Sequence, residues 1–450
     1  MALKLFGTDG IRGVANTFPM TAEVAFRLAQ ALSKLVCQNV RRVAIGKDTR
    51  VSSYMLESAL IAGFTSMGVD VIKMRVVPTP LITSQIADLN VDMGLMITAS
   101  HNPYFDNGIK LIDRFGDKFS DEWTSKVEDL LTSDEKFVPS KDALGKVYKD
   151  KTSVMAYIQN VLRIAPNPDA LQGLRIVLDC ANGSFSTIMP QIFKNLGAGV
   201  ITLSAEPDGY NINKDCGSQH TEHLSEVVVQ SHAHLGIAVD GDGDRIIVVD
   251  NQGQRIDGDQ IIAFLATYLY KHGNLKQNAV VATIWSNLGL EKYLHALGIN
   301  FYRSLVGERY VIEKMRETGA SLGGEESGHM VLLDYARTGD ALIAGLIVCL
   351  GLMEDNRQTC EIFPLFEKCP CKITNIRFNN KSEVNSIFEL DEVKNVIDDA
   401  TKRIQNHGSV IVRKSGTEPV LKIRVEGEDE ALVFDVSSQI VDTIEKLKEV

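Results

Sequence analysis

The stretch GLMITASHNP, residues 94–103, shows how this chain is built. Its apolar residues form a run of strand length, and Asn102-Pro103 is typical of a turn. The pattern predicts a short buried strand that ends at Ser100. Ser100 is therefore expected on the loop at the carboxyl end of the strand, where open α/β sheets bind their ligands.

The same arrangement recurs along the chain. A strand that runs into a polar loop and then a helix is predicted at RRVAIGKDTR (41–50), LRIVLDCANG (174–183) and AVVATIWSNLG (279–289). A second strand with a polar loop follows in each segment, at MGLMITASHNP (93–103), HLGIAVDGDGDR (234–245) and SLGGEESGHM (321–330). The spacing is too irregular for a short-period solenoid and favours three related α/β domains.

From about Cys369 onward the pattern changes. KITNIRF and SVIVRKSGTEPVLKIRVEG are typical of strands, and EALVFDVSSQIVDTIEKLKEV is typical of a closing helix. This part is predicted to form a smaller C-terminal α+β domain. The predicted domains are residues 1–153, 154–255, 256–368 and 369–450.

The composition narrows the class of protein. Of 450 residues, 44% are hydrophobic and 23% charged, which is ordinary for a globular protein. No apolar run approaches the roughly 20 residues that span a bilayer, and MALKLFGTDGIRG lacks a signal-peptide core, so we expect a cytoplasmic protein without a membrane partner. The net charge of −11 argues against nucleic acid as a partner, and seven cysteines without a regular framework are expected to be reduced.

Three carboxylates at alternate positions follow the apolar run 235–239. Asp240, Asp242 and Asp244 are separated by glycines that let the backbone bend, so their oxygens can converge on one hard cation such as Mg²⁺. An EF-hand is excluded, because Arg245 stands where that loop needs glycine and Asn251 where it needs glutamate. An acidic turn without metal is the alternative.

Ser100 by itself is weak evidence for a catalytic site, because most loop serines are turn or cap residues. His101 beside it can equally be a packed histidine. No G-x-S-x-G sequence surrounds Ser100, which disfavours an α/β-hydrolase. A phosphorylated serine offers an alternative chemistry, since it carries about −1.5 to −2 charges and oxygens that can complete a magnesium shell.

Two further loops are candidates for ligand binding. Arg413–Pro419 combines two cations, two hydroxyls and a glycine, which can form an anion-binding nest or simply a solvated charged turn. Gly323–His329 places acceptors and donors between glycines, which suits sugar hydroxyls or an amine but also a flexible acidic turn.

Taken together, the four loops closely resemble those of the α-D-phosphohexomutase superfamily. The likeness runs from Leu5–Gly13 through Gly46–Arg50 and Thr98–Lys110 to Arg413–Pro419, in the same order. The resemblance implies four domains around a central cleft. It also implies that Ser100 is the catalytic phosphoserine and, with Asp240, Asp242 and Asp244, a ligand of one Mg²⁺ per chain.

The resemblance assigns further residues. Arg12, His101, Lys110 and Arg245 match positions that line the phosphoryl-transfer site, with Lys110 and His101 as candidates for proton transfer and Arg245 as a substrate contact. Glu325, Ser327 and His329 match the sugar-binding motif. Arg413, Ser415, Gly416 and Thr417 match the grip on the phosphate that is not transferred.

The loops are most similar to the glucosamine branch of the superfamily. The implied reaction converts glucosamine 6-phosphate to glucosamine 1-phosphate through a bisphosphorylated sugar, on the route to UDP-N-acetylglucosamine. Glucosamine 1,6-bisphosphate or a similar bisphosphosugar, or an activating kinase, would prime Ser100. A homodimer is one option for the assembly.

Other functions remain open from the sequence. The nearest rival is a phosphomannomutase/phosphoglucomutase with the same mechanism, and a phosphosugar phosphatase or a silent sugar-phosphate binder are further alternatives. Glu326 and Lys422 depart from the glutamine and arginine that the family often has at these places, and lysine lacks the bidentate fork of arginine.

Overall fold

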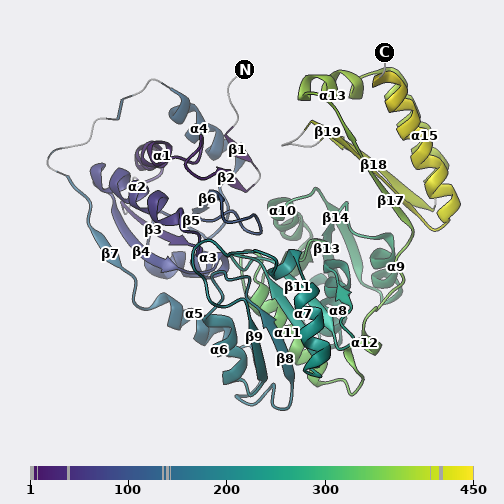
Figure 1. Ribbon diagram of the computed structural model, residues 1–450, viewed down its shortest axis with the longest axis horizontal. Coiled ribbons are helices and arrows are strands. Elements are labelled where there is room, and N and C mark those ends of the chain that lie inside the picture. Colours follow the sequence, from purple (N-terminus) through teal and green to yellow (C-terminus); the bar gives the residue numbers. More distant parts are fainter. Residues whose placement is uncertain are drawn as a thin grey trace. The chain divides into compact units, whose positions relative to one another are not determined.

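The computed structural model of the chain contains three α/β sheets and one smaller antiparallel sheet (Figure 1). It describes residues 5–7, 9–37, 41–133, 136–137, 141, 143–405, 407–414 and 419–448. The chain divides into two compact units, one of Met1–Trp285 with Ile299–Leu365 and one of Ser286–Gly298 with Phe366–Val450.

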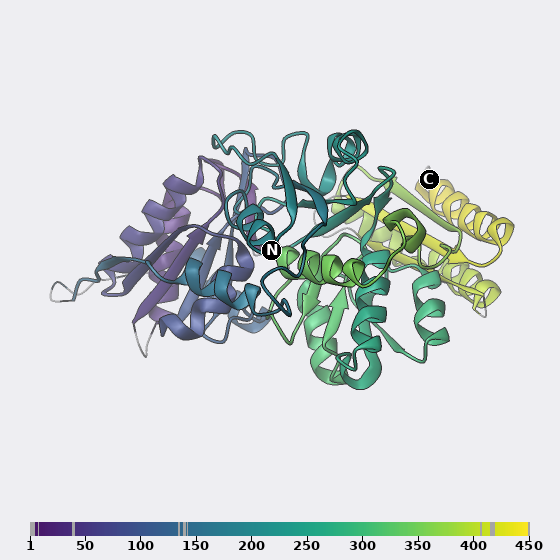
Figure 2. The same cartoon turned by 90° about the horizontal axis from the view of Figure 1, so that it is seen from below.

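The first sheet has seven strands in the order β1-β2-β6-β5-β3-β4-β7. Its strands are β1 (Phe6–Gly7), β2 (Gly10–Val14), β3 (Arg42–Lys47), β4 (Asp70–Val76), β5 (Met93–Ile97), β6 (Asp106–Asp113) and β7 (Val147–Lys149). The accompanying helices are α1 (Ala22–Leu35), α2 (Ser53–Ser66), α3 (Thr79–Leu89), α4 (Asp121–Thr132) and α5 (Ser153–Leu162). Helices lie on both sides of the strands (Figure 2), which explains why β5 is buried along its whole length.

The second sheet has the order β12-β11-β10-β8-β9. It contains β8 (Arg175–Asp179), β9 (Gly199–Leu203), β10 (Leu235–Val239), β11 (Ile246–Asp250) and β12 (Arg255–Ile256), with α6 (Ile188–Asn195) and α7 (Glu222–Gln230). Every residue of β10 and β11 is buried.

The third sheet has the order β14-β13-β15-β16. It contains β13 (Ala279–Thr283), β14 (Asn300–Ser304), β15 (Leu322–Gly324) and β16 (Met330–Leu332), with α8 (Gly258–Lys271), α10 (Glu308–Thr318), α11 (Ala341–Met353) and α12 (Thr359–Ile362). Helix α11 is buried on nearly every side, and its sequence is accordingly apolar all round.

These three sheets share one topological feature that positions the predicted loops. In each sheet a strand pairs in parallel with one neighbour and antiparallel with the next: β5 with β3 and β6, β10 with β8 and β11, β15 with β13 and β16. Each predicted chemical loop joins such an antiparallel pair. The prediction of three related α/β domains is confirmed.

The second unit carries a three-stranded antiparallel sheet in the order β17-β19-β18. Its elements are β17 (Cys371–Arg377), β18 (Gly408–Lys414), β19 (Val420–Gly427), α9 (Leu288–Ala296), α13 (Lys381–Phe388), α14 (Asp391–Ile404) and α15 (Glu430–Lys448). Helix α15 buries Val433, Val436, Ile440 and Ile444 at helical spacing against this sheet. The smaller α+β domain is thus confirmed, whereas the domain boundaries stay predictions.

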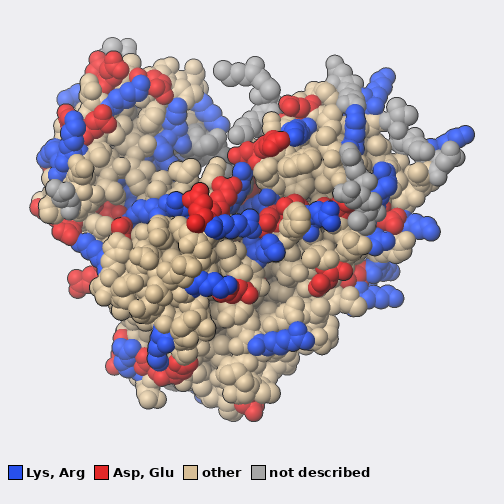
Figure 3. All heavy atoms as spheres, turned by 180° about the vertical axis from the view of Figure 1, so that it is seen from behind, with Lys and Arg blue, Asp and Glu red and all other residues tan. Residues whose placement is uncertain are grey.

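The cysteines, the helices and the surface charges have ordinary features. All seven cysteines are free thiols, and none of the helices among the described residues has the length and apolarity needed to cross a membrane. On the face of the molecule in Figure 3, lysine and arginine side chains are interspersed with aspartate and glutamate.

Candidate active site

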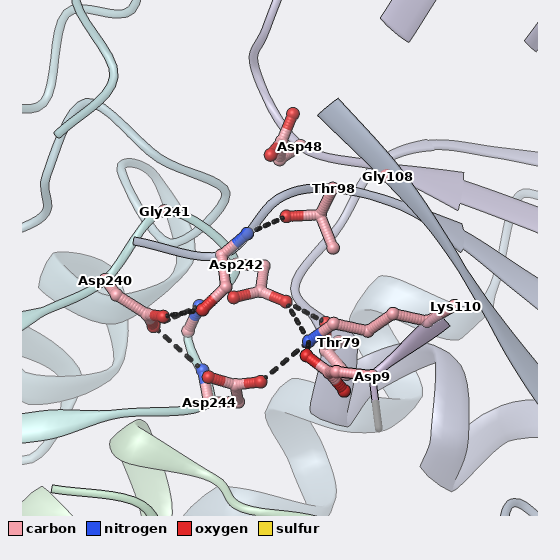
Figure 4. A network of polar contacts seen from close by, with 12 residues as sticks. Asp9, Asp48, Thr79, Thr98, Gly108, Lys110, Asp240, Gly241, Asp242 and Asp244 are labelled. Atoms are coloured by element: carbon pink, nitrogen blue, oxygen red, sulfur yellow. Dashed lines mark hydrogen bonds and ion pairs between the residues drawn. The ribbon is translucent and has the colours of Figure 1, made fainter. Parts of the chain in front are cut away.

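Ser100 lies buried on the loop between β5 and β6, as the sequence predicts. Its hydroxyl donates a hydrogen bond of 2.6 Å to Oδ2 of Asp240. Asp240 lies beside Asp242 and Asp244 in the second sheet's loop (Figure 4). Its backbone N–H donates to Oγ1 of Thr98 at 2.9 Å, and its φ angle is +54°. A left-handed backbone is uncommon for a residue other than glycine, so the surrounding loop holds Ser100 in a conformation that it would seldom adopt freely.

The three aspartates of the second loop converge as predicted. They are buried, and one ligand oxygen from each lies within 4.8 Å of the others. Oδ1 of Asp240 accepts from the backbone N–H groups of Gly243, Asp244 and Arg245 at 3.1, 3.1 and 3.2 Å, which folds the loop around this carboxyl. Burial, and then the charges of Asp244 and Asp242, raise the pKa of Asp240 well above its ordinary value.

Lys110 reaches the same cluster from β6. Its Nζ lies 2.7 Å from Asp242 Oδ2, 2.8 Å from Asp244 Oδ2 and 3.4 Å from Asp9 Oδ2. Burial alone would lower the pKa of Lys110, but the three carboxylates outweigh it and raise the pKa well above the usual value. Lys110 is therefore a charged donor that balances the carboxylates, and of the two candidates for proton transfer it is the poorer acceptor.

The carboxylate oxygens of the three aspartates are suitable ligands for a hard divalent cation. Among the described residues, no hydrogen-bond donor reaches the buried Oδ1 atoms of Asp242 and Asp244. Buried carboxylate oxygens without donors are costly, and carboxylate oxygens are the ligands that Mg²⁺ prefers. Thr79, which the sequence analysis did not identify, orients Asp242 by donating from Oγ1 to its Oδ2 at 2.6 Å.

Arg12, His101 and Arg245 surround the serine loop and the aspartates. Nδ1 of His101 lies 3.4 Å from Ser100 Oγ. Burial, and then the cations Arg245 and Arg12, lower the pKa of His101 to about 3, so its imidazole is neutral near neutral pH. Arg12 forms an ion pair with Asp9. For Arg245, burial lowers the pKa but Asp244 and Asp240 outweigh it, so the net shift is upward.

The third loop, between β15 and β16, contributes the predicted sugar-binding residues. Glu325 Oε1 accepts from the backbone N–H of Gly307 at 2.8 Å, and Ser327 Oγ donates to Glu325 Oε2 at 3.2 Å. His329 pairs with Arg245 in an antiparallel β-bridge, which joins this loop to the loop of the three aspartates. A cavity of about 170 Å³ is lined by Arg12, Asp244, Arg245, Glu325 and His329 together with Asp9, Lys118 and Glu308.

Asp9, Lys118 and Glu308 form a charge network that the sequence did not reveal. Lys118 makes ion pairs with both Asp9 and Glu308, and Glu308 Oε1 lies 2.9 Å from His329 Nε2. Burial would lower the pKa of His329, but Glu308 and Asp244 raise it to about 9. His329 is therefore a cation at neutral pH. Asp9 belongs to a family motif, whereas no local pattern marks Lys118 or Glu308.

The fourth loop belongs to the other unit. Arg413 lies at the end of β18 and is half-buried, while Ser415, Gly416 and Thr417 lie outside the described residues. The predicted role of these four residues in phosphate binding stays a prediction.

Comparison with known proteins identifies the family. The chain matches phosphoglucomutase/phosphomannomutase alpha/beta/alpha domain I at residues 3–137, domain II at 155–253, domain III at 257–369 and the C-terminal domain at 373–443. These segments span most of the chain, so the chain belongs to the phosphoglucomutase/phosphomannomutase family. The predicted resemblance to the α-D-phosphohexomutase superfamily is thereby confirmed.

Individual proteins of this family are similar to the chain over nearly its whole length. The phosphoglucosamine mutase of Paramagnetospirillum magneticum is 44% identical over 449 residues, which cover 99% of each chain. That of Granulibacter bethesdensis is 45% identical over 444 residues, covering 98% of this chain and 96% of the relative. The crystal structure of a phosphoglucomutase/phosphomannomutase family protein from Burkholderia thailandensis shares 25% identity with a TM-score of 0.80, and covers 98% of this chain and 97% of that one.

Proposed function

We propose that this protein is a phosphoglucosamine mutase that interconverts glucosamine 6-phosphate and glucosamine 1-phosphate. The observation that carries the proposal is the buried Ser100 hydroxyl, 2.6 Å from Asp240 in a loop of three convergent carboxylates. The names of relatives that are 44% and 45% identical over nearly the full length support the choice of sugar.

In the proposed reaction, phosphoserine 100 donates its phosphoryl group to the free sugar oxygen. The P–Oγ bond breaks and a P–O bond to the sugar forms. A base near Ser100 takes the proton of the sugar hydroxyl and passes it to Ser100 Oγ, the leaving group. The resulting bisphosphorylated sugar turns around and returns its other phosphoryl group to Ser100. Ser100 thus begins and ends the cycle phosphorylated, as a mutase requires.

The protein's own residues supply three contributions to this cycle. Lys110, Arg12 and Arg245 place positive charge around the transferring group, which stabilises a transition state with charge on its oxygens. Neutral His101, with Nδ1 3.4 Å from Ser100 Oγ, is the candidate for proton acceptor, whereas Lys110 already carries its proton. When bound by the aspartates and phosphoserine 100, Mg²⁺ would offset further charge on the phosphoryl group.

The sugar would be held by the third loop. Glu325, Ser327 and cationic His329 offer acceptors and donors for its hydroxyls, and Glu325-Glu326 suits the substrate ammonium. Arg413, Ser415, Gly416 and Thr417 match the family's contacts to the phosphate that is not transferred. A bisphosphosugar or a kinase would supply the first phosphate, and a cytoplasmic location fits a phosphosugar substrate.

The test compares kcat/KM for the phosphates of glucosamine, glucose and mannose, with Ser100→Ala as the inactive control. We expect the glucosamine form to be preferred, and Ser100→Ala to bind sugar phosphate without turnover. Equal or better turnover of the glucose or mannose form would favour the alternative, a phosphomannomutase/phosphoglucomutase. Stoichiometric release of free phosphate would indicate a phosphatase instead.

A further inference from the structure

Among the described residues, Arg50 is the largest side chain that is fully buried, and its guanidinium faces the serine loop. Nη2 donates to the backbone carbonyls of Ser100 at 2.9 Å and Asn102 at 2.8 Å. Nη1 donates to the carbonyl of Asp106 at 3.0 Å and also to that of Pro103. Nε donates to Asp48 Oδ2 at 2.8 Å, which fixes the plane of the fork. A single side chain thus holds three carbonyls of the serine loop and the carbonyl of Asp106, the first residue of β6.

Asn213 reaches the same loop from the second sheet's side. Its Nδ2 donates to the carbonyls of Ser100 at 2.8 Å and Asn102 at 3.0 Å. Its own backbone is fixed because its N–H donates to the carbonyl of Ala181 at 2.9 Å. The carbonyls of Ser100 and Asn102 therefore each accept two side-chain donors, one from Arg50 and one from Asn213.

The packing around these donors leaves little room for movement. A Cβ atom at Gly241 would lie 2.9 Å from the Ser100 carbonyl oxygen and 3.0 Å from Asn213 Nδ2. A side chain at position 241 would therefore be too close to its neighbours. The loop of the aspartates packs directly against the Ser100 carbonyl and the Asn213 amide. The loop that carries Ser100 and the loop that carries the metal-ligand candidates are thus held in one arrangement.

We propose that Arg50 and Asn213 are positioning residues that hold Ser100 in the geometry for phosphoryl transfer; this inference rests on the function proposed above. Neither side chain is hydrogen-bonded to Ser100 Oγ, so each acts through the backbone. The carbonyls of an irregular buried loop need donors, and a planar guanidinium fork can serve several at once. Displacement of a reacting atom by about 1 Å can cost on the order of 10²-fold in rate.

The test uses Arg50→Lys, which keeps the charge but loses the fork, and Asn213→Ala, which removes two of the donors. Arg41→Lys is the matched control, because Arg41 also donates to backbone carbonyls, those of Met67 and Gly68, but far along the chain from the serine loop. Each full-length protein is primed with bisphosphosugar. Steady-state kcat and KM, single-turnover transfer from labelled phosphoserine 100, and thermal unfolding are then measured.

We expect Arg50→Lys to lower kcat and single-turnover transfer by about 10²-fold and Asn213→Ala by about tenfold, with KM changed less than about threefold. Arg41→Lys should keep its kcat. A folded Arg50→Lys or Asn213→Ala variant with kcat within about twofold of wild type would overturn the proposal. A fall in kcat of Arg41→Lys in proportion to its loss of stability would also overturn it, because loss of stability alone would then explain the lower rates. If Arg50→Lys does not fold, Asn213→Ala decides.

Failure of the proposed function gives a different result. In that case the wild type itself shows no mutase turnover with any of the phosphosugars. The clamp is then tested without phosphoserine, by hydrogen exchange of the backbone amides of the serine loop. Faster exchange in Asn213→Ala than in the wild type supports the clamp, and identical exchange overturns it.

Discussion

Replacement of Lys110 by methionine tests the electrostatics of the site most simply. The ammonium of Lys110 compensates Asp242, Asp244 and Asp9 at 2.7, 2.8 and 3.4 Å. Lys110, Asp242 and Asp244 are buried, and Asp9 is half-buried. Methionine fills similar space without the charge. Removing one partner of a buried ion pair leaves an uncompensated charge and typically costs about 3–5 kcal/mol. We expect the free energy of unfolding to fall by about this amount.

The assay is urea unfolding followed by circular dichroism near neutral pH, without added divalent cation. Lys126→Met is the control, because Lys126 pairs with Glu122 at 2.6 Å on an exposed surface, where such a pair is worth about 0–1 kcal/mol. A loss for Lys110→Met no larger than that for Lys126→Met would refute the reasoning.

Acid should reduce the difference between wild type and Lys110→Met. For Asp9 and Asp244, burial raises the pKa but nearby cations, Lys110 first among them, outweigh it, so both pKa values fall below the ordinary range. A carboxyl with a lowered pKa contributes stability that is complete above about pH 4 and is lost as the pH falls further. The advantage of wild type should therefore shrink below about pH 4.

Three further predictions concern Asp340, Asp242 and Glu308. Asp340 caps α11 and accepts a hydrogen bond from Tyr157. Burial raises the pKa of its carboxyl from 3.8 to about 6. The contribution of this carboxyl to stability is therefore complete below about pH 4 and is lost as the pH rises through 6. Asp340→Asn should therefore gain about 3 kcal/mol on wild type between about pH 4 and 7 in urea unfolding, and parallel pH curves would contradict this. Asp242→Asn should weaken Mg²⁺ binding at least about tenfold by calorimetry while Asp208→Asn, at an exposed turn, leaves it unchanged; equal affinities would remove the aspartates as ligands. Glu308→Gln should lower kcat/KM about tenfold through loss of its ion pairs with Lys118 and His329, and an unchanged kcat/KM would show that the network does not support sugar binding.

The sequence predicted those parts of the site that are encoded locally. Ser100 and the three aspartates each follow a short apolar run that predicts a buried strand, and the glycines and proline beside them indicate where the strand ends. The three repeats of strand, loop and strand were recognisable for the same reason, since β5, β10 and β15 each continue into a polar loop.

The parts that the sequence did not reveal depend on contacts between distant segments. Asn213 lies more than one hundred residues from Ser100, and Glu308 lies nearly two hundred from Lys118. Neither pair has a spacing that a periodic pattern can show. The sequence likewise left Lys110 and His101 as candidates for proton transfer without fixing either role. Only the fold places Lys110 between Asp242 and Asp244 and so shows that it is charged.

Phosphorylation of Ser100 is the central claim, and intact mass with peptide mapping tests it most directly. The purified protein is measured before and after mixing with glucosamine 6-phosphate and Mg²⁺, with and without priming by a bisphosphosugar. The proposed cycle predicts a phosphate adduct on Ser100 that exchanges with the substrate. If no adduct forms on Ser100 even after priming, or if an adduct forms but does not exchange, the mutase cycle proposed for this protein is wrong.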